Sequence, residues 1–348
     1  MQYRSIGDLS LSVAAGAWKV PADVDLIVGI PRSGLLAGSM LALHLNIPIV
    51  ELDCYLNGGA GRIGRTSKHT VSVGGNDVRK VLVVDDTVAT GSTMAQIRRE
   101  IDAADFGDKV LVCAIYGTQK SHDGFDLVFE TVGTPRIFEW NMMRHKRIAD
   151  ACFDIDGVLC HDPDPADNDD GQRYARFLST ARPLYIPKLK VAHLVTSRLE
   201  RYRPETEAWL KTMGIEYGKL WMIDLPSAEE RRRLKAHAPF KAKVYQESGA
   251  SLFIESEDKQ AEDIARLSSR PVLSIGGQRM VWPDDPAANR RHIRRAGWNV
   301  PKRSTKSRVK RVALQLCRHL HLPVDGLSHP AARPTSTPAG ISSPSLNK

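Results

Sequence analysis

The sequence predicts an α/β protein with two parallel sheets in tandem, followed by a basic tail. Three observations lead to this fold class. Strand-like apolar runs alternate with helical stretches, the alternation restarts near residue 150, and the composition changes near residue 285. Such alternation is typical of parallel sheets with helices on their faces. We therefore expect one domain at residues 1–145, a second at 146–285, and a tail at 286–348.

The first half of the chain supplies three strand-like runs. DLIVGI (25–30) is followed by a helical stretch, PRSGLLAGSMLALHL (31–45). VLVVDD (81–86) is followed by STMAQIRREIDAA (92–104), and VLVCAIY (110–116) comes next. Short apolar runs without internal polar residues are typical of strands that are buried on both faces.

The second half repeats this organisation without repeating the sequence. We expect its strands at ACFDIDGV (151–158), KVAHLVTS (190–197), LWMI (220–223) and ASLFIES (250–256). YRPETEAWLKTMGI (202–215) has the spacing of an amphipathic helix. We expect FEWNMMRH (138–145) to join the two domains, with Trp140 in the core between them.

Composition narrows the class of protein. The chain has 348 residues, of which 42% are hydrophobic, so two packed cores are expected. No apolar run approaches the roughly 18 residues of a membrane-spanning helix, and the first residues lack the apolar core of a signal peptide. The five cysteines are scattered and form neither a disulfide framework nor a CxxC metal site. We expect a reduced, cytoplasmic setting.

The net charge of +9 is concentrated in the tail. From Pro286 onward the chain has 13 basic residues and one acidic residue, so the body is close to neutral. RVKRVALQLCRHLHL (308–322) has the pattern of a helix with one apolar and one basic side, which suits a membrane surface, nucleic acid or a partner enzyme. A solvated tail is the simpler alternative, and the Pro/Ser/Thr-rich end is expected to be disordered. No RNA-binding motif is present, so we expect no specific nucleic-acid partner.

Two adjacent acids follow the buried run VLVV. Asp85 and Asp86 are expected at the carboxyl end of a parallel strand, where such sheets bind ligands. The following turn contains Thr87, Thr90, Gly91, Ser92 and Thr93 at the start of a helix. Free N–H groups at a helix start favour a phosphate, and glycine allows close approach. Two carboxylates beside a phosphate site suit the hydroxyls of a sugar phosphate.

This segment resembles the phosphoribosyl pyrophosphate (PRPP) signature of type I phosphoribosyltransferases, in which four hydrophobic residues precede two acids and a Thr-Gly turn. GIPRSGLLAG (29–38) resembles the pyrophosphate loop of that family. The resemblance covers roughly residues 20–135. It implies that the loop is lined by Pro31, Arg32, Ser33 and Gly34. It also implies a mobile catalytic loop at 57–77, with Arg62, Arg65 and Lys68 as candidates.

CFDIDGVLC (152–160) indicates a second chemistry. It resembles the first motif of haloacid-dehalogenase-type (HAD) phosphatases, which reads DxDG after a hydrophobic strand. The resemblance implies that Asp154 is the nucleophile, that Asp156 is the general acid and base, and that Mg²⁺ screens the repulsion between carboxylate and phosphate. The chain would then consist of two tandem Rossmann-like domains, the second with a minimal cap.

The remaining motifs of the phosphatase family have candidates in the right order. Thr196 in HLVTSR supplies the strand-end hydroxyl, and Lys241 is preferred to Lys243 as the lysine. The acidic motif begins at Glu255, where the family usually has aspartate, so the expected metal ligands are Asp154, Asp156 and Glu255. This departure puts turnover in doubt. The short insertions predict an open site, which suits large substrates.

Two sites in one chain predict two linked reactions. Phosphoribosyl transfer from PRPP leaves a 5-phosphate on the product, and a phosphatase would remove it. The net reaction is transfer of ribofuranose to a glycan-type acceptor, and the fused arrangement resembles proteins associated with ribofuranose addition to bacterial polysaccharides. One alternative is nucleobase salvage with a fused nucleotidase. Another is a PRPP-sensing regulator without catalysis.

Overall fold

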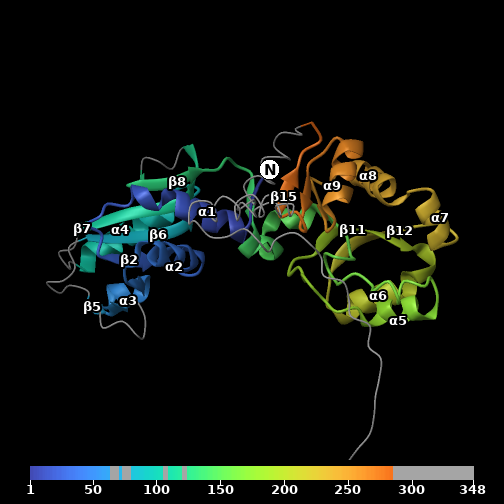
Figure 1. The fold of residues 1–348 in the computed structure, drawn as a ribbon, viewed down its shortest axis with the longest axis horizontal. Coiled ribbons are helices and arrows are strands. Elements are labelled where there is room, and N and C mark those ends of the chain that lie inside the picture. Colours follow the sequence, from blue (N-terminus) through green and yellow to red (C-terminus); the bar gives the residue numbers. More distant parts are fainter. Residues whose placement is uncertain (63–69, 73–79, 105–108, 120–123, 285–348) are drawn as a thin grey trace, which may run out of the picture. The chain divides into compact units, whose positions relative to one another are not determined.

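A computed structural model describes residues 1–62, 70–72, 80–104, 109–119 and 124–284, all within one compact unit, Met1–Ala296 (Figure 1). The expected tail and two catalytic-loop candidates, Arg65 and Lys68, lie outside these ranges. The described part contains two large parallel sheets with helices on their faces, as the alternation predicts. No helix in it is long and apolar enough to span a membrane.

The first sheet has the strand order β5-β4-β3-β2-β6-β7-β8. Its parallel strands are β2 (Leu26–Gly29), β3 (Ile49–Glu51), β6 (Lys80–Thr87), β7 (Lys109–Gly117) and β8 (Leu127–Thr131). Two short strands, β4 (Ala60–Arg62) and β5 (Thr70–Ser72), extend one edge in antiparallel orientation.

Helices cover both faces of the first sheet. They are α1 (Ile6–Gly16), α2 (Ser33–Leu45), α3 (Leu52–Leu56) and α4 (Ser92–Ala104). Alternate residues of β6 face opposite sides, so Leu82 and Val84 pack with α1 and α2, whereas Val81 and Val83 pack with α3 and α4. Burial on both faces explains why this strand is an uninterrupted apolar run.

The second sheet has the strand order β12-β11-β10-β13-β14-β15. Its strands are β10 (Ala151–Phe153), β11 (Val191–Leu199), β12 (Tyr217–Ile223), β13 (Leu252–Glu255), β14 (Val272–Ser274) and the antiparallel β15 (Arg279–Val281). The helices are α5 (Gln172–Thr180), α6 (Arg203–Thr212), α7 (Ala228–Arg233), α8 (His237–Ser248) and α9 (Asp258–Ser268). One face packs with α6 through Trp209 and Leu210, and the other packs with α8 and α9.

Short elements lie between the two large sheets in sequence. β9 (Arg136–Phe138) pairs with β1 (Gln2–Arg4) in parallel, and two 3₁₀-helices follow, η3 (Glu139–Arg144) and η4 (Lys146–Asp150). Trp140 packs with the core of the first sheet and Met142 with the core of the second. The strands of the two sheets end at Thr131 and begin again at Ala151, and the expected domain boundary at 145/146 stays a prediction.

The expected strands all form, but their ends differ from the expectation. Asp85 and Asp86 lie at the carboxyl end of β6, as predicted, and the strand extends one residue further, to Thr87. The helix after this turn begins at Ser92, as predicted. β10 ends at Phe153, so the residues of the DxDG motif lie in the loop that follows the strand.

Candidate functional site

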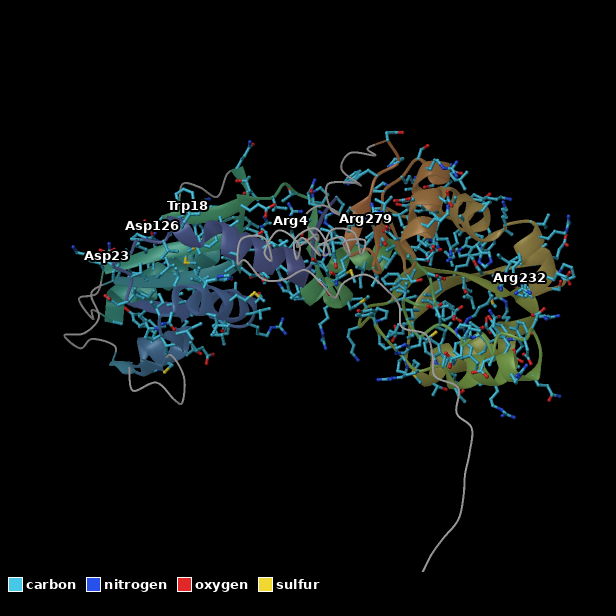
Figure 2. The ribbon with its side chains drawn as sticks, viewed as in Figure 1. Arg4, Trp18, Asp23, Asp126, Arg232 and Arg279 are labelled. Carbon is cyan, nitrogen blue, oxygen red and sulfur yellow. The ribbon has the colours of Figure 1, made fainter. Side chains whose placement is uncertain are left out.

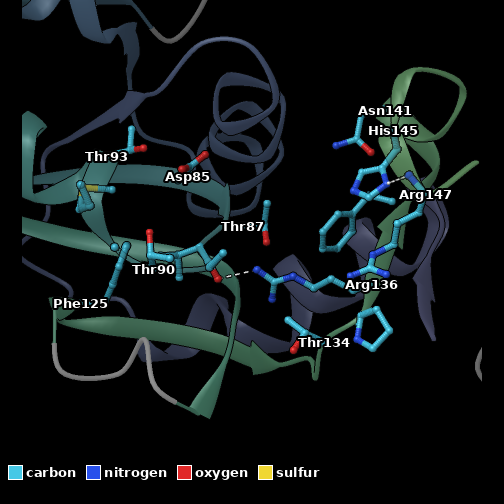
Figure 3. Close-up of a pocket in the computed structure, with 16 residues that line it drawn as sticks. Asp85, Thr87, Thr90, Thr93, Phe125, Thr134, Arg136, Asn141, His145 and Arg147 are labelled. Carbon is cyan, nitrogen blue, oxygen red and sulfur yellow. Dashed lines mark hydrogen bonds between the residues drawn. The ribbon is translucent and has the colours of Figure 1, made fainter. Parts of the chain in front are cut away.

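A cavity of about 440 Å³ opens at the carboxyl end of the first sheet (Figure 3). One side is formed by Asp85, Thr87, Thr90, Gly91 and Thr93, five of the residues expected to bind PRPP. The opposite side comes from the chain around β9 and η3 and includes Arg136, Asn141, His145 and Arg147. The predicted turn is therefore one wall of a cavity.

Asp86 has two hydrogen-bond partners within the chain. Its carboxylate accepts hydrogen bonds from the Ser33 hydroxyl and the Trp140 indole N–H, both at 2.8 Å. The contact from Trp140 comes from a residue 54 positions away, so the local sequence gave no indication of it. Asp86 is 3% exposed and does not line the cavity. Its contacts hold the Asp86 carboxylate against Ser33 and Trp140 and outside the cavity lining.

Asp85 is the acid that faces the cavity. Burial, together with the adjacent Asp86 carboxylate, raises the pKa of Asp85 to about 7. Its Oδ1 atom accepts the backbone N–H of Asp86 at 2.9 Å. At neutral pH a proton therefore moves on or off Asp85 easily, and a ligand hydroxyl can hydrogen-bond to either form.

Two glycines matter for the backbone here: Gly91 lines the cavity, and Gly34 lies outside its lining in the 31–34 loop. Gly91 has a φ of +81°, a conformation that side chains disfavour. A Cβ atom on Gly34 would lie 2.7 Å from the carbonyl oxygen of Val84, so glycine allows the 31–34 loop to pack against β6. The helix α4 begins directly after the Gly91 turn, and its first N–H groups have no partner within the helix.

The other expected PRPP contacts lie outside the cavity lining. Pro31, Arg32 and Ser92 are exposed, while Ser33 is tied to Asp86. The cavity lining also includes residues that the sequence did not single out: Phe138, Asn141, His145 and Arg147. No motif marked them, because they come from an irregular segment with no period or glycine pattern.

A second cavity, of about 350 Å³, opens at the carboxyl end of the second sheet. Four expected residues line it: Asp154, Asp156, Lys241 and Glu255. They come from the loop after β10, the end of β13 and the helix α8. Parallel strands bring these distant segments to one edge, as the motif order predicts.

Lys241 lies at the centre of this cluster. Its ammonium group donates to Asp154, Glu255 and Gln260, each at 2.8 Å, and it is 2% exposed. Burial alone would lower the pKa of Lys241, but the two carboxylates outweigh burial and raise it. Burial raises the pKa of Asp154 against the opposing charge of Lys241. Lys243 is exposed and lies 3.9 Å from Glu247, outside the cavity.

Asp156 is held by a buried arginine that the sequence analysis did not identify. The Arg198 guanidinium donates to both Asp156 oxygens, at 2.7 to 3.2 Å, and is completely buried. Burial alone would raise the pKa of Asp156, but Arg198 outweighs it and holds that pKa below its usual value. A carboxylate in this state accepts protons weakly, so Arg198 orients Asp156 and keeps it ionised.

Ser197, rather than Thr196, lines the second cavity. Thr196 is completely buried, and its hydroxyl accepts the backbone N–H of Arg198 at 3.2 Å. The Ser197 hydroxyl oxygen is buried without a hydrogen-bond partner. Adjacent strand residues point to opposite faces, so a choice between neighbours in HLVTSR needs the strand orientation.

The expected magnesium site stays a prediction. Carboxylate oxygens are suitable ligands for Mg²⁺. However, the described residues contain no group of three or more His, Cys, Asp or Glu side chains arranged to hold a metal ion. Lys241 joins the Asp154 and Glu255 carboxylates, and Arg198 occupies that of Asp156.

Comparison with known proteins supports one of the two resemblances. Residues 7–123 match the family model described as phosphoribosyl transferase domain. Over 102 residues the chain is 30% identical to a protein named transcriptional regulator GfcR 2 of Methanosarcina acetivorans, covering 28% of this chain and 47% of that protein. The namesake of Methanosarcina barkeri is 29% identical over 113 residues, 32% of this chain and 52% of that one. The chain thus spans about half the length of these relatives.

Solved structures similar to this chain include a purine phosphoribosyltransferase from Pyrococcus horikoshii, with 19% identity and a TM-score of 0.29. They also include a xanthine-guanine-hypoxanthine phosphoribosyltransferase from Helicobacter pylori, with 14% identity and a TM-score of 0.31. Each alignment covers 40% of this chain, and 92% and 91% of the respective structures. The match to the family model supports a phosphoribosyltransferase domain at residues 7–123, about a third of the chain.

Proposed function

We propose that this chain transfers ribofuranose to a glycan-type acceptor in two steps. In the first, an acceptor hydroxyl oxygen bonds to the anomeric carbon of PRPP, the bond to pyrophosphate breaks, and the hydroxyl proton is lost. In the second, the phosphoryl group of the product moves to Asp154, and water then releases it as inorganic phosphate. The observation that carries the proposal is the presence of two cavities, one at Asp85 and one at Asp154, in a single chain.

The first step depends on positioning. The turn from Thr87 to Thr93 supports a phosphate through its hydroxyls and the start of α4, and Asp85 supports the ribose hydroxyls beside it. As pyrophosphate leaves, positive charge develops at the anomeric carbon. A nearby carboxylate stabilises that charge.

Two unsatisfied oxygens support a hydroxyl-bearing ligand. Thr87 Oγ1 and Asn141 Oδ1 are buried and have no hydrogen-bond partner among the described residues, and both residues line the first cavity. The Asn141 oxygen can only accept, so its partner must be a donor such as a sugar hydroxyl. Buried polar atoms without partners are costly, so a ligand that satisfies them gains affinity.

The second step depends on the cluster around Lys241. The ammonium group offsets part of the negative charge of Asp154 and Glu255, which reduces the repulsion that a phosphate meets at a carboxylate nucleophile. Asp156, which Arg198 orients and keeps ionised, lines the same cavity and would orient the attacking water by accepting a hydrogen bond from it. The preference for a large acceptor follows from the openness of the site expected from its short insertions.

Two alternatives have observations in their favour. A nucleobase could stack on Phe138, which lines the first cavity and itself stacks on Trp140 with ring centroids 4.8 Å apart. This alternative predicts a nucleoside as the final product. A regulator that binds PRPP without turnover is favoured by the names of the two archaeal relatives. It predicts PRPP binding without pyrophosphate release.

The test supplies the full-length protein with Mg²⁺, PRPP and a panel of saccharides and nucleobases. Pyrophosphate release would be followed, and the products would be identified by mass spectrometry. We expect a saccharide that gains one pentose, together with equal amounts of pyrophosphate and phosphate. A nucleoside product, or PRPP binding without pyrophosphate, would replace the proposal with one of the alternatives.

A further inference from the structure

Arg231 is a buried cation in the second cavity that has no role in the two proposed steps. It belongs to α7, whose sequence AEERRR places three arginines in a row. Arg232 and Arg233 are exposed, and Arg233 pairs with Glu230. Arg231 instead is 7% exposed and lines the same cavity as Asp154.

Within the described part of the chain, the contacts of Arg231 include no carboxylate. One terminal nitrogen donates to the carbonyl oxygen of Ser197, and the guanidinium also interacts with the Tyr174 side chain. Its Nε is buried with no hydrogen-bond partner, and Arg231 is absent from the ion pairs formed among the described residues. A buried guanidinium without an anion is unfavourable, so its retention here points to an anionic ligand.

The neighbours of Arg231 show which anion would fit. The described cations that line the cavity are Arg231 and Lys241, and burial holds the pKa of His237 to about 4, so that imidazole is neutral near pH 7. An ammonium group has three protons to donate. Lys241 donates all of them to Asp154, Glu255 and Gln260, so it has none left for a ligand.

We propose that Arg231 binds the non-transferring oxygens of a substrate phosphoryl group, next to the unpartnered hydroxyl of Ser197. The inference rests on the proposed phosphatase step and adds to it a binding residue outside the motifs that suggested that step. A guanidinium presents several N–H groups in a plane, which matches phosphate oxygens better than an ammonium group does. Arg231 would offset the carboxylates that would otherwise repel a dianion.

The test compares Arg231→Met and Arg231→Lys with Arg232→Met, a matched change of an exposed arginine on the same helix (Figure 2). The full-length proteins would hydrolyse p-nitrophenyl phosphate, with inorganic phosphate as inhibitor. In Arg231→Met we expect the KM and the inhibition constant of phosphate to rise together, by roughly 10- to 100-fold, with a smaller change in kcat. Arg231→Lys should recover part of this loss, and Arg232→Met should resemble wild type.

An unchanged inhibition constant in Arg231→Met, with only the melting temperature lowered, would overturn the inference and leave Arg231 as a partner of the Ser197 carbonyl. If wild type hydrolyses no phosphate ester, the proposed phosphatase step fails, and calorimetric titration with inorganic phosphate tests Arg231 by itself. The first cavity is the same in wild type and in Arg231→Met, so the difference in bound phosphate reports the second cavity. No difference in that titration would overturn the inference.

Discussion

Lys241 and Lys243 are two positions apart in KAK, yet their surroundings differ completely. Lys241 is buried against two carboxylates, whereas Lys243 is exposed and 3.9 Å from Glu247. The sequence favoured Lys241 only weakly as the lysine of the second site, because spacing from a motif does not show which side of a helix faces the sheet. The orientation of α8 supplies that information, since Lys241 lies on the face that also carries Ala238, Ala242 and Tyr245.

Replacing Lys241 should therefore be far more damaging than replacing Lys243. Lys241→Met leaves two buried carboxylates without a counterion, which should lower the free energy of unfolding by about 3–5 kcal/mol and abolish phosphatase activity. Lys243→Met should change stability by no more than about 0.5 kcal/mol. Urea unfolding and phosphatase assays of both variants provide the measurement. Equal losses in the two variants would contradict the assignment.

The raised pKa of Asp85 predicts that this residue makes the folded protein less stable as pH rises, which is the opposite of the usual effect of an aspartate. Its pKa in the folded protein is about 7, above that of an exposed aspartate. A raised folded-state pKa means that the unfolded chain loses this proton first, so the contribution to stability is present below about pH 4 and is lost as pH rises through 7. Asp85→Asn mimics the protonated form and should stabilise the protein at pH 8, relative to pH 4.5, by on the order of 2–4 kcal/mol. Unfolding of both proteins at the two pH values checks this, and an equal difference at both would count against it.

Among the helices and strands, an element could be predicted from the sequence wherever one apolar pattern ran through the whole segment. β6 could be predicted because both faces of this strand are buried, and α4 could be predicted because it starts directly after a Thr-Gly-Ser turn. The side of the first cavity formed by the chain around β9 and η3 could not be predicted from the sequence. This wall includes Arg136, Asn141 and Arg147, which belong to short elements. Their position depends on the pairing of β9 with β1, which is more than 130 residues earlier in the sequence.

The 31–34 loop gives a prediction at this scale. Gly34→Ala would place a Cβ atom 2.7 Å from the Val84 carbonyl oxygen, so the loop must move away from β6 and from Asp86. We expect at least a tenfold loss of PRPP affinity, because roughly 1.4 kcal/mol of displaced contacts corresponds to that factor. Gly7→Ala is the control, since its Cβ would lie at an ordinary 3.5 Å from Ser5 Oγ. Calorimetric titration with PRPP provides the comparison, and equal affinities would show that the loop is not part of the site.

At the scale of the whole molecule, both parallel sheets and the order of the motifs were predictable from the sequence. The side chains that complete each site were not. Ser197 lines the second cavity, where Thr196 was expected. Arg198 binds Asp156, although the two residues are 42 positions apart in the sequence. Such choices depend on strand orientation and on contacts between distant segments, which a motif in one sequence does not contain.

The two cavities in one chain predict that their activities can be separated by substitution. Asp154→Asn removes the proposed nucleophile and preserves the shape of the buried cluster, whereas the first cavity is built from other residues. The substituted protein should still release pyrophosphate from PRPP at the wild-type rate. Gly34→Ala should show the converse, with phosphatase activity intact.

Loss of the 5-phosphate after phosphoribosyl transfer can be detected with a variant in which only the second step is blocked. Asp154→Asn would be incubated with Mg²⁺, PRPP and the saccharide and nucleobase panel, and the products would be followed by mass spectrometry before and after addition of wild-type protein. We expect a saccharide that carries a pentose phosphate, and we expect its phosphate group to be lost only when wild-type protein is added. A nucleotide product, or no pyrophosphate from any acceptor while PRPP remains bound, would contradict it.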